Sequence, residues 1–204
     1  MSIHKNKSGS RIGVFGGTFN PPHIGHLIVA EEVRQNFALD RIVFVPSARP
    51  PHKTQSPVID SAHRYHMTQL ATEDNPHFAV SDIEIRRPGT SYTVDTVKSF
   101  RDTYGPDVDI FFIMGGDSIF EIDTWKDPEQ IFNCCTIIVT SRPGFHLSKV
   151  EERFKAKVLI TEVSQIGVSS TDIRQRLQDG KSIAYLVPQA VEAYIRSEGL
   201  YRSG

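Results

Sequence analysis

The fold is decided by the stretch Arg11-Ile-Gly-Val-Phe-Gly-Gly-Thr-Phe-Asn-Pro-Pro-His-Ile-Gly-His26. Its apolar first part predicts a short strand, and Gly16 and Gly17 predict a tight turn at which the backbone approaches a ligand closely. The two prolines suit the start of a helix, whose unpaired N–H groups and partial positive charge attract a phosphate. His23 and His26 are three residues apart, so both imidazoles can donate hydrogen bonds to the same anion. The stretch therefore predicts a phosphate site where a strand gives way to a helix.

The segments that follow complete a unit of strand, helix and strand. Apolar residues recur at helical spacing over 27–37, and 40–46 is a short apolar run that a proline ends. The connection should be right-handed and the strands parallel, which places ligands at the carboxyl ends of the strands. We therefore expect an α/β fold, with a single Rossmann-like domain, a parallel sheet and helices on both faces.

The rest of the chain alternates in the same way. Helices are expected over 61–73, 168–177 and 188–197, and strands over 78–81, 83–85, 109–114, 133–140 and 157–160. A further helix, ending near Gly105, should begin at Ser91 or Thr93, because either residue is a suitable N-cap.

Polar residues near two strand ends are further candidates for the site. Asp117 follows two glycines after a strand, where its carboxylate can accept a hydrogen bond from a ribose hydroxyl, cap a helix, or both. Arg174 stands one turn into the helix at 168–177, within reach of a β- or γ-phosphate. The hydroxyls at the start of that helix either receive the same anion or only cap the helix.

The proline-rich loop 47–57 directly follows a strand and carries cationic side chains. Arg49, His52 and Lys53 are three potentially cationic residues within five positions. The loop is either an ordinary solvated connection or a mobile clamp over phosphates, with Arg49 and Lys53 as its main residues.

Composition limits the classes of partner. At 204 residues the chain can bury one sizeable core, and its formal net charge of −1 gives no electrostatic reason to expect nucleic acid or an anionic membrane as a partner. No segment approaches the roughly 18 apolar residues of a membrane-spanning helix. Cys134 and Cys135 fit neither a metal motif nor a disulfide framework, so we expect two packed thiols in a strand of a cytoplasmic protein.

The first ten residues differ in character from the rest. Residues 1–10 are polar, without the apolar run of a signal peptide, and we expect a disordered N-terminal tail followed by one domain over 11–204. The sequence leaves the oligomeric state open, including a homo-oligomer.

Two motifs carry a family resemblance. Residues 16–26 resemble the His-x-Gly-His signature of nucleotidyltransferases, and Val168-Ser-Ser-Thr-Asp-Ile-Arg174 resembles their Ser-Ser-Thr-x-Ile-Arg signature. Together with further segments, they make the chain similar to bacterial nicotinate mononucleotide adenylyltransferases from residue 11 to residue 201. The resemblance implies a fold of the nucleotidyltransferase type and adenylyl transfer from ATP to nicotinate mononucleotide, giving deamido-NAD and pyrophosphate in NAD biosynthesis.

The resemblance also implies roles for individual residues. Those expected to bind ATP are Gly16, Gly17, Thr18, Phe19, His23, His26, Asp117, Ser169, Ser170, Thr171 and Arg174. Those expected to bind nicotinate mononucleotide are Asn20, Arg49, Lys53, Tyr92, Thr93, Trp125 and Arg142. The catalytic residues expected are His23, His26, Lys53 and Arg174. Mg²⁺ should accompany ATP through phosphate oxygens and water, without a metal site of the protein's own.

Several alternatives remain at this stage. The chain has no Gly-x-Gly-x-x-Gly fingerprint, P-loop or Gly-x-Ser-x-Gly elbow, which argues against a dinucleotide-dependent dehydrogenase, a P-loop enzyme and an α/β-hydrolase. A sister transferase acting on nicotinamide mononucleotide, phosphopantetheine or a cytidylyl acceptor is the nearest competitor. A protein of a different class, which binds ATP as a sensor without turnover, is the other.

Overall fold

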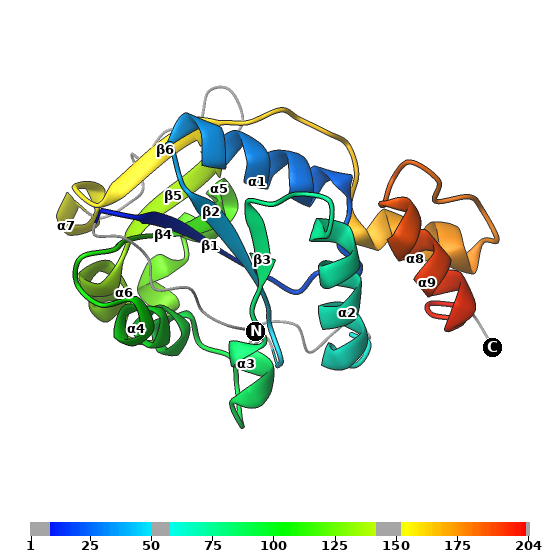
Figure 1. The fold of residues 1–204 in the computed structure, drawn as a ribbon, viewed down its shortest axis with the longest axis horizontal. Helices are drawn as coiled ribbons and strands as arrows, with labels where there is room; N and C mark the ends of the chain where they lie inside the picture. The colour runs from blue at the N-terminus through cyan, green and yellow to red at the C-terminus, as the bar shows by residue number, and fades with distance from the viewer. Residues whose placement is uncertain (1–8, 50–57, 142–151, 203–204) are drawn as a thin grey trace.

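The computed structural model describes residues 9–49, 58–141 and 152–202, which form an α/β fold around one sheet (Figure 1). The six strands are all parallel and lie in the order β3-β2-β1-β4-β5-β6. They are β1 Arg11–Gly17, β2 Arg41–Pro46, β3 Phe78–Val80, β4 Asp109–Gly115, β5 Thr136–Ser141 and β6 Val158–Glu162. The predicted fold class is confirmed.

Helices cover both faces of this sheet. The helices are α1 Ile24–Asn36, α2 Ser61–Thr72, α3 Ile83–Arg86, α4 Thr93–Tyr104, α5 Gly116–Ile119, η1 Ile122–Thr124, α6 Pro128–Cys134, α7 Glu152–Lys155, α8 Ser170–Gln178 and α9 Gln189–Ser197. Figure 1 shows α1 on one face and α4 and α6 on the other. Alternate residues of β1, β2 and β4 supply the two cores, because successive side chains of a strand point to opposite faces.

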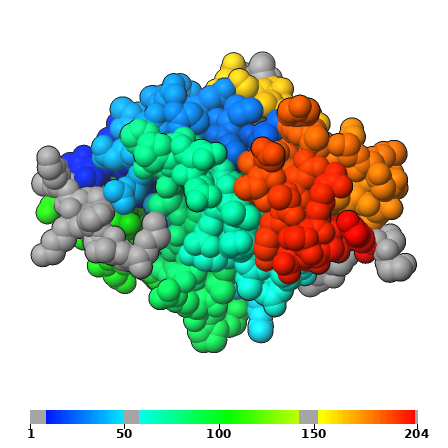
Figure 2. Space-filling model, turned by 45° about the vertical axis from the view of Figure 1, so that its right-hand side comes forward, coloured from blue at the N-terminus to red at the C-terminus, as the bar shows by residue number. Residues whose placement is uncertain are grey.

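A third apolar cluster joins the C-terminal helices to α2. Met67 of α2, Ile173 of α8 and Ile195 of α9 are all fully buried in it. Figure 2 shows α8 and α9, in orange and red, packed against α2, in cyan to green. Because α2 follows the carboxyl end of β2, this cluster brings residues from the end of the chain to the edge of the sheet where ligands are expected.

Two segments predicted as strands differ in the structure. Residues 83–85 belong to α3, since β3 ends at Val80 and the two isoleucines fit a short helix as well as a strand. Cys134 ends α6 and Cys135 follows it, so the thiols are free and buried as expected but lie before β5 rather than in a strand.

The opening glycines serve a purpose different from the predicted turn. Gly16 and Gly17 belong to β1, where they pair with Val45 and Pro46 of β2. A Cβ on Gly17 would lie 2.7 Å from the ring of Phe19, so glycine there makes room for a side chain. The chain turns at Phe19 instead, whose φ of 47° is in the left-handed region.

The described part of the chain also bears on membranes and on the tail. None of the helices among the described residues is long and apolar enough to cross a membrane. The backbone N–H of Gly9 donates to the carbonyl of Asp107 at 3.1 Å, and Ser10 accepts from Asp109. The remainder of the predicted tail, residues 1–8, lies outside the described residues.

Candidate active site

The two histidines of the first motif meet at the start of α1. His23 is the N-cap in an extended conformation, and its backbone N–H donates to Nδ1 of His26 at 3.1 Å. A neutral His26 that accepts at Nδ1 carries its proton on Nε2, so this bond selects the tautomer. The two rings stack with their centroids 3.7 Å apart. The predicted pairing of the imidazoles is therefore present, with one ring at the cap and the other in the first turn.

Gly25 leaves room for the His23 ring because it has no side chain. A Cβ built on Gly25 would lie 3.1 Å from both Cε1 and Nδ1 of His23, closer than side chains normally approach. The glycine between the histidines is thus required by the ring folded back over it.

We expect Gly25→Ala to lower kcat about tenfold, because a shift of a few tenths of an ångström in the His23 ring misplaces a donor. Stability should stay equal or rise by up to about 1 kcal/mol, since alanine favours the interior of a helix over glycine. Steady-state kinetics and thermal unfolding of the same preparation measure both. Gly25→Ser should lose at least as much activity, and an unchanged kcat in both variants would show that the ring is not constrained there.

His23 is held as a neutral base. Its side chain is 7% exposed, and burial lowers its pKa from 6.5 to about 4. Nδ1 of His23 is buried without a hydrogen-bond partner among the described residues. A neutral imidazole with an unpaired nitrogen is ready to bond a ligand group that enters the site.

The lowered pKa predicts a loss of stability in acid. Between pH 6.5 and about pH 4 the unfolded chain protonates His23 while the folded protein does not, so folding should become less favourable by up to about 3 kcal/mol. Chemical denaturation across this range should show the slope in wild type and a flatter profile in His23→Asn. The exposed His66 supplies the control His66→Asn, which should keep the wild-type slope. Equal slopes in all three proteins would contradict a neutral buried His23.

The hydrogen bond from Arg34 keeps the titration of Glu31 outside most of this pH window. Its hydrogen bond from Arg34 lowers its pKa from 4.5 to about 2, so its contribution to stability is lost only as the pH falls below about 4.5. The wild-type slope between pH 4.5 and 6.5 can therefore be compared with that of His23→Asn without this carboxylate.

The second motif docks directly onto the first. Ser170 donates to the carbonyl of Pro21 at 2.8 Å, and Arg174 donates to the carbonyl of Asn20 at 2.8 Å. Ser169 caps α8, since its hydroxyl accepts from the N–H of Asp172. The N-terminal ends of α1 and α8 are therefore tied to the same short loop, although 149 residues separate Ser170 from Pro21.

A cavity of about 350 Å³ lies at the carboxyl ends of β1 and β4. The start of α4 and the segment after η1 complete its walls. The wall residues include Phe15, Gly16, Gly17, Thr18, Ser91, Tyr92, Thr93, Phe112, Met114, Gly115, Trp125 and Lys126. Its size and its mixture of aromatic and polar walls suit a small organic ligand.

The start of α4 is held by contacts with two other segments of the chain. Its N-cap is Tyr92 rather than the predicted Ser91 or Thr93, because the Ser91 hydroxyl instead accepts from the N–H groups of Ala48 and Arg49. Lys126 lies 4.6 Å from the Tyr92 ring centroid. The backbone N–H groups of this first helical turn are thus fixed at the cavity wall, where they can receive an anion.

Glu84 adds a buried carboxyl to the same wall. The Thr96 hydroxyl donates to its Oε1 at 2.6 Å, while Oε2 is buried without a hydrogen-bond partner among the described residues. Burial raises the pKa of Glu84, and the hydrogen bond from Thr96 opposes this in part. The carboxyl links α3 to α4 behind the cavity.

Comparison with known proteins decides the family. The cytidylyltransferase-like family model matches residues 14–176. A Moorella thermoacetica protein named as a probable nicotinate-nucleotide adenylyltransferase is 52% identical over 94% of this chain and 92% of its own length. The chain belongs to the nicotinate-nucleotide adenylyltransferase family. A Thermus thermophilus adenylyltransferase of the same name is 45% identical over 94% of this chain and the whole of its own length.

A solved structure with low sequence identity shares the fold. The structure of Plasmodium falciparum nicotinic acid mononucleotide adenylyltransferase complexed with NaAD aligns with a TM-score of 0.75, over 94% of this chain and 97% of that chain. At 19% identity the likeness concerns the fold alone.

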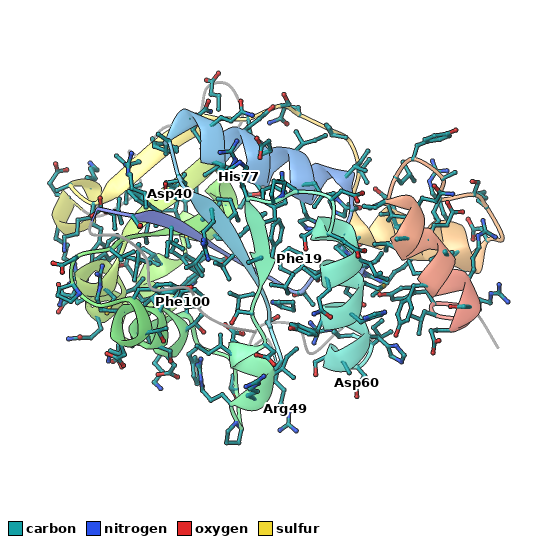
Figure 3. All side chains as sticks on the ribbon, viewed as in Figure 1. Phe19, Asp40, Arg49, Asp60, His77 and Phe100 are labelled. Atoms are coloured by element: carbon teal, nitrogen blue, oxygen red, sulfur yellow. The ribbon has the colours of Figure 1, made fainter. Side chains whose placement is uncertain are left out.

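Other residues predicted for the adenylyltransferase site fall in varied surroundings. Phe19 is buried in the interior and packs edge-on against His26 at 5.0 Å, while Arg49 is exposed at the edge of the molecule (Figure 3). Asp117 is exposed in α5 and is not part of the cavity wall described above. Lys53 and Arg142 lie outside the described residues.

Two residues of this adenylyltransferase were missed by sequence reasoning. Tyr201 donates to Oδ1 of the buried Asn20 at 2.7 Å. Arg64 of α2 is 1% exposed and donates to three carbonyls. Its spacing from the buried Met67 and Thr68 places it on the inner face of α2, and that helical spacing was the available signal.

Proposed function

We propose that the protein transfers the adenylyl group of ATP to nicotinate mononucleotide, giving nicotinate adenine dinucleotide and pyrophosphate. The observation that carries this proposal is the docking of the α1 and α8 N-terminal ends on one loop, beside a separate cavity at the ends of β1 and β4. This arrangement offers one place for a polyphosphate and another for an acceptor. The names of the relatives from Moorella thermoacetica and Thermus thermophilus support the choice of substrates.

The chemistry requires no covalent intermediate. An oxygen of the acceptor's 5′-phosphate attacks the α-phosphorus of ATP, and the bond from that phosphorus to the oxygen that joins it to the β-phosphate breaks, so that this oxygen leaves as part of pyrophosphate. The nucleophile is already an anion at neutral pH, so the protein need only align the reactants and stabilise the charge that grows on the leaving group.

The phosphate side of the proposed site draws its donors from both motifs. We assign the Nε2–H of His26, the His23 ring and the N–H groups of Gly16, Gly17 and Thr18 to the ATP phosphates. The hydroxyls of Ser170 and Thr171, with the guanidinium of Arg174, are assigned to the β/γ end. Phe19 and Ser169 hold the surrounding loop and helix cap, and Lys53 and Arg49 remain candidates for closure over the phosphates.

The acceptor side is the cavity. We assign Trp125 to stacking on the pyridine ring and the N–H groups at Tyr92 and Thr93 to its carboxylate. Asn20 and Arg142 remain candidates for the mononucleotide phosphate, and Asp117 for the adenosine ribose.

We propose that Mg²⁺ enters with ATP, held mainly by phosphate oxygens and water, and that the reaction takes place in the cytoplasm. Phosphate oxygens and water are the hard oxygen ligands that Mg²⁺ prefers. Bound in this way, the cation neutralises charge on the pyrophosphate. The free thiols of Cys134 and Cys135 suit a reducing compartment.

The test is pyrophosphate release by purified protein with Mg-ATP and, in parallel, nicotinate mononucleotide, nicotinamide mononucleotide and phosphopantetheine. We expect release with the nicotinate form far above the other two. Release with another acceptor would keep the reaction type and overturn the assignment of Tyr92, Thr93 and Trp125. ATP binding without release with any acceptor would favour a nucleotide sensor.

A further inference from the structure

Arg64 is a buried cation that joins three separate segments of the chain. It lies in α2 with 1% of its surface exposed. Its guanidinium donates to the carbonyls of Thr18 at 2.8 Å, Ala48 at 3.2 Å and Ile59 at 3.1 Å. A guanidinium offers its donors in a fixed planar fork, so these contacts fix the direction of three backbone segments at once.

The carbonyls that it holds belong to the edges of the site. Thr18 directly follows β1, lines the cavity and opens the loop that leads to His23. Ala48 follows β2, and its N–H donates to the Ser91 hydroxyl at 3.0 Å. Through Ala48 and Ser91, Arg64 is therefore connected to the start of α4 on the acceptor side.

The carboxylates of Asp60 and Glu84 favour the charge of Arg64 only from a distance. Among the described residues Arg64 forms no ion pair, and its guanidinium is satisfied by backbone oxygens. Among the described residues, backbone carbonyls are its only direct hydrogen-bond partners, which is unusual because burial of an ion is costly unless its surroundings compensate for it. An apolar side chain could fill the same space at a lower free-energy cost, so a role in the site explains the charged side chain better than packing does.

We propose that Arg64 is a positioning residue for adenylyl transfer. It aligns the loop after β1, which carries the phosphate donors, with the loop after β2, which holds the start of α4. This inference rests on the proposed function. Without the guanidinium, the two loops are no longer held in a fixed relative position, and neither are the two substrates that they bind.

The test compares two substitutions within α2. Arg64→Lys keeps a cation but lacks the planar fork that donates to the three carbonyls. Met67→Ala removes a fully buried side chain from the cluster with α8 and α9 and serves as the control for lost stability. Both variants are assayed with wild type for dinucleotide formation, well below their unfolding temperatures. We expect kcat of Arg64→Lys to fall by roughly ten- to a hundredfold and that of Met67→Ala to stay within about twofold.

The second measurement is chemical rescue of the Arg64→Ala variant. In Arg64→Ala, added guanidinium at millimolar concentration should restore part of kcat, whereas urea, which has the same shape without the charge, should not. If Arg64 were merely structural, its substitution would lower thermal stability, and guanidinium and urea would not differ in their effect on kcat. Equal kcat in Arg64→Lys and wild type, an equal loss in Met67→Ala, or rescue by urea as strong as by guanidinium would each overturn the positioning role. A wild type that forms no dinucleotide would instead overturn the proposed function, and this inference with it.

Discussion

His26→Ala should lower kcat by about 10²–10³, the usual cost of removing one preorganised donor to a developing negative charge. The reason lies in the bond between the His23 N–H and Nδ1 of His26, which leaves Nε2–H as the donor of the neutral ring. Stacking on His23 and edge contact with Phe19 fix the orientation of that donor before substrate arrives. The measurement is steady-state turnover with saturating Mg-ATP and nicotinate mononucleotide.

The control separates chemistry from helix capping. Alanine also removes the acceptor for the His23 N–H, which should cost about 0.5–2 kcal/mol of stability. Gln at the same position can accept that N–H as in a capping box, so His26→Gln should recover stability but remain at least about tenfold below wild type in kcat. Full activity in His26→Gln would mean that the cap alone matters, and near wild-type turnover in His26→Ala would remove His26 from the mechanism.

Trp125→Ala should raise KM for nicotinate mononucleotide by a factor that corresponds to roughly 1–3 kcal/mol, with little effect on KM for ATP. Trp125 lines the cavity and is itself supported by edge contact with Phe112 at 6.4 Å. Loss of the indole removes the flat surface on which a pyridine ring would stack. Initial rates with each substrate varied in turn give the two constants.

The conservative variant supplies the control for this prediction. Trp125→Phe keeps an aromatic face and should recover most of the affinity for the mononucleotide. A rise in KM that is equal for both substrates would instead indicate that Trp125 only supports the cavity wall.

The sequence was most informative where local patterns coincide with the fold. Alternation of apolar strands and amphipathic helices predicted the parallel sheet, which the structure confirms. The two motifs predicted two helix starts, and the structure brings them to one loop. The roles of these residues toward each substrate stay predictions.

Features that depend on long-range contacts were not predictable in the same way. Residues 83–85 have an apolar spacing that fits a strand or a short helix, and only the end of β3 at Val80 decides between them. Burial of Arg64 depends on carbonyls as far as 46 residues away in sequence. The need for glycine at position 17 comes from the ring of Phe19, which no turn pattern reveals.

The bond from Tyr201 to Asn20 has a consequence for synthesis on the ribosome. The two residues are 181 positions apart, and translation at roughly 5–20 residues per second separates their appearance by roughly 10 to 40 s. The loop that carries Asn20 leaves the ribosome well before Tyr201 and gains this contact only when Tyr201 has emerged. A nascent chain therefore carries its first motif for many seconds before Tyr201 can support Asn20.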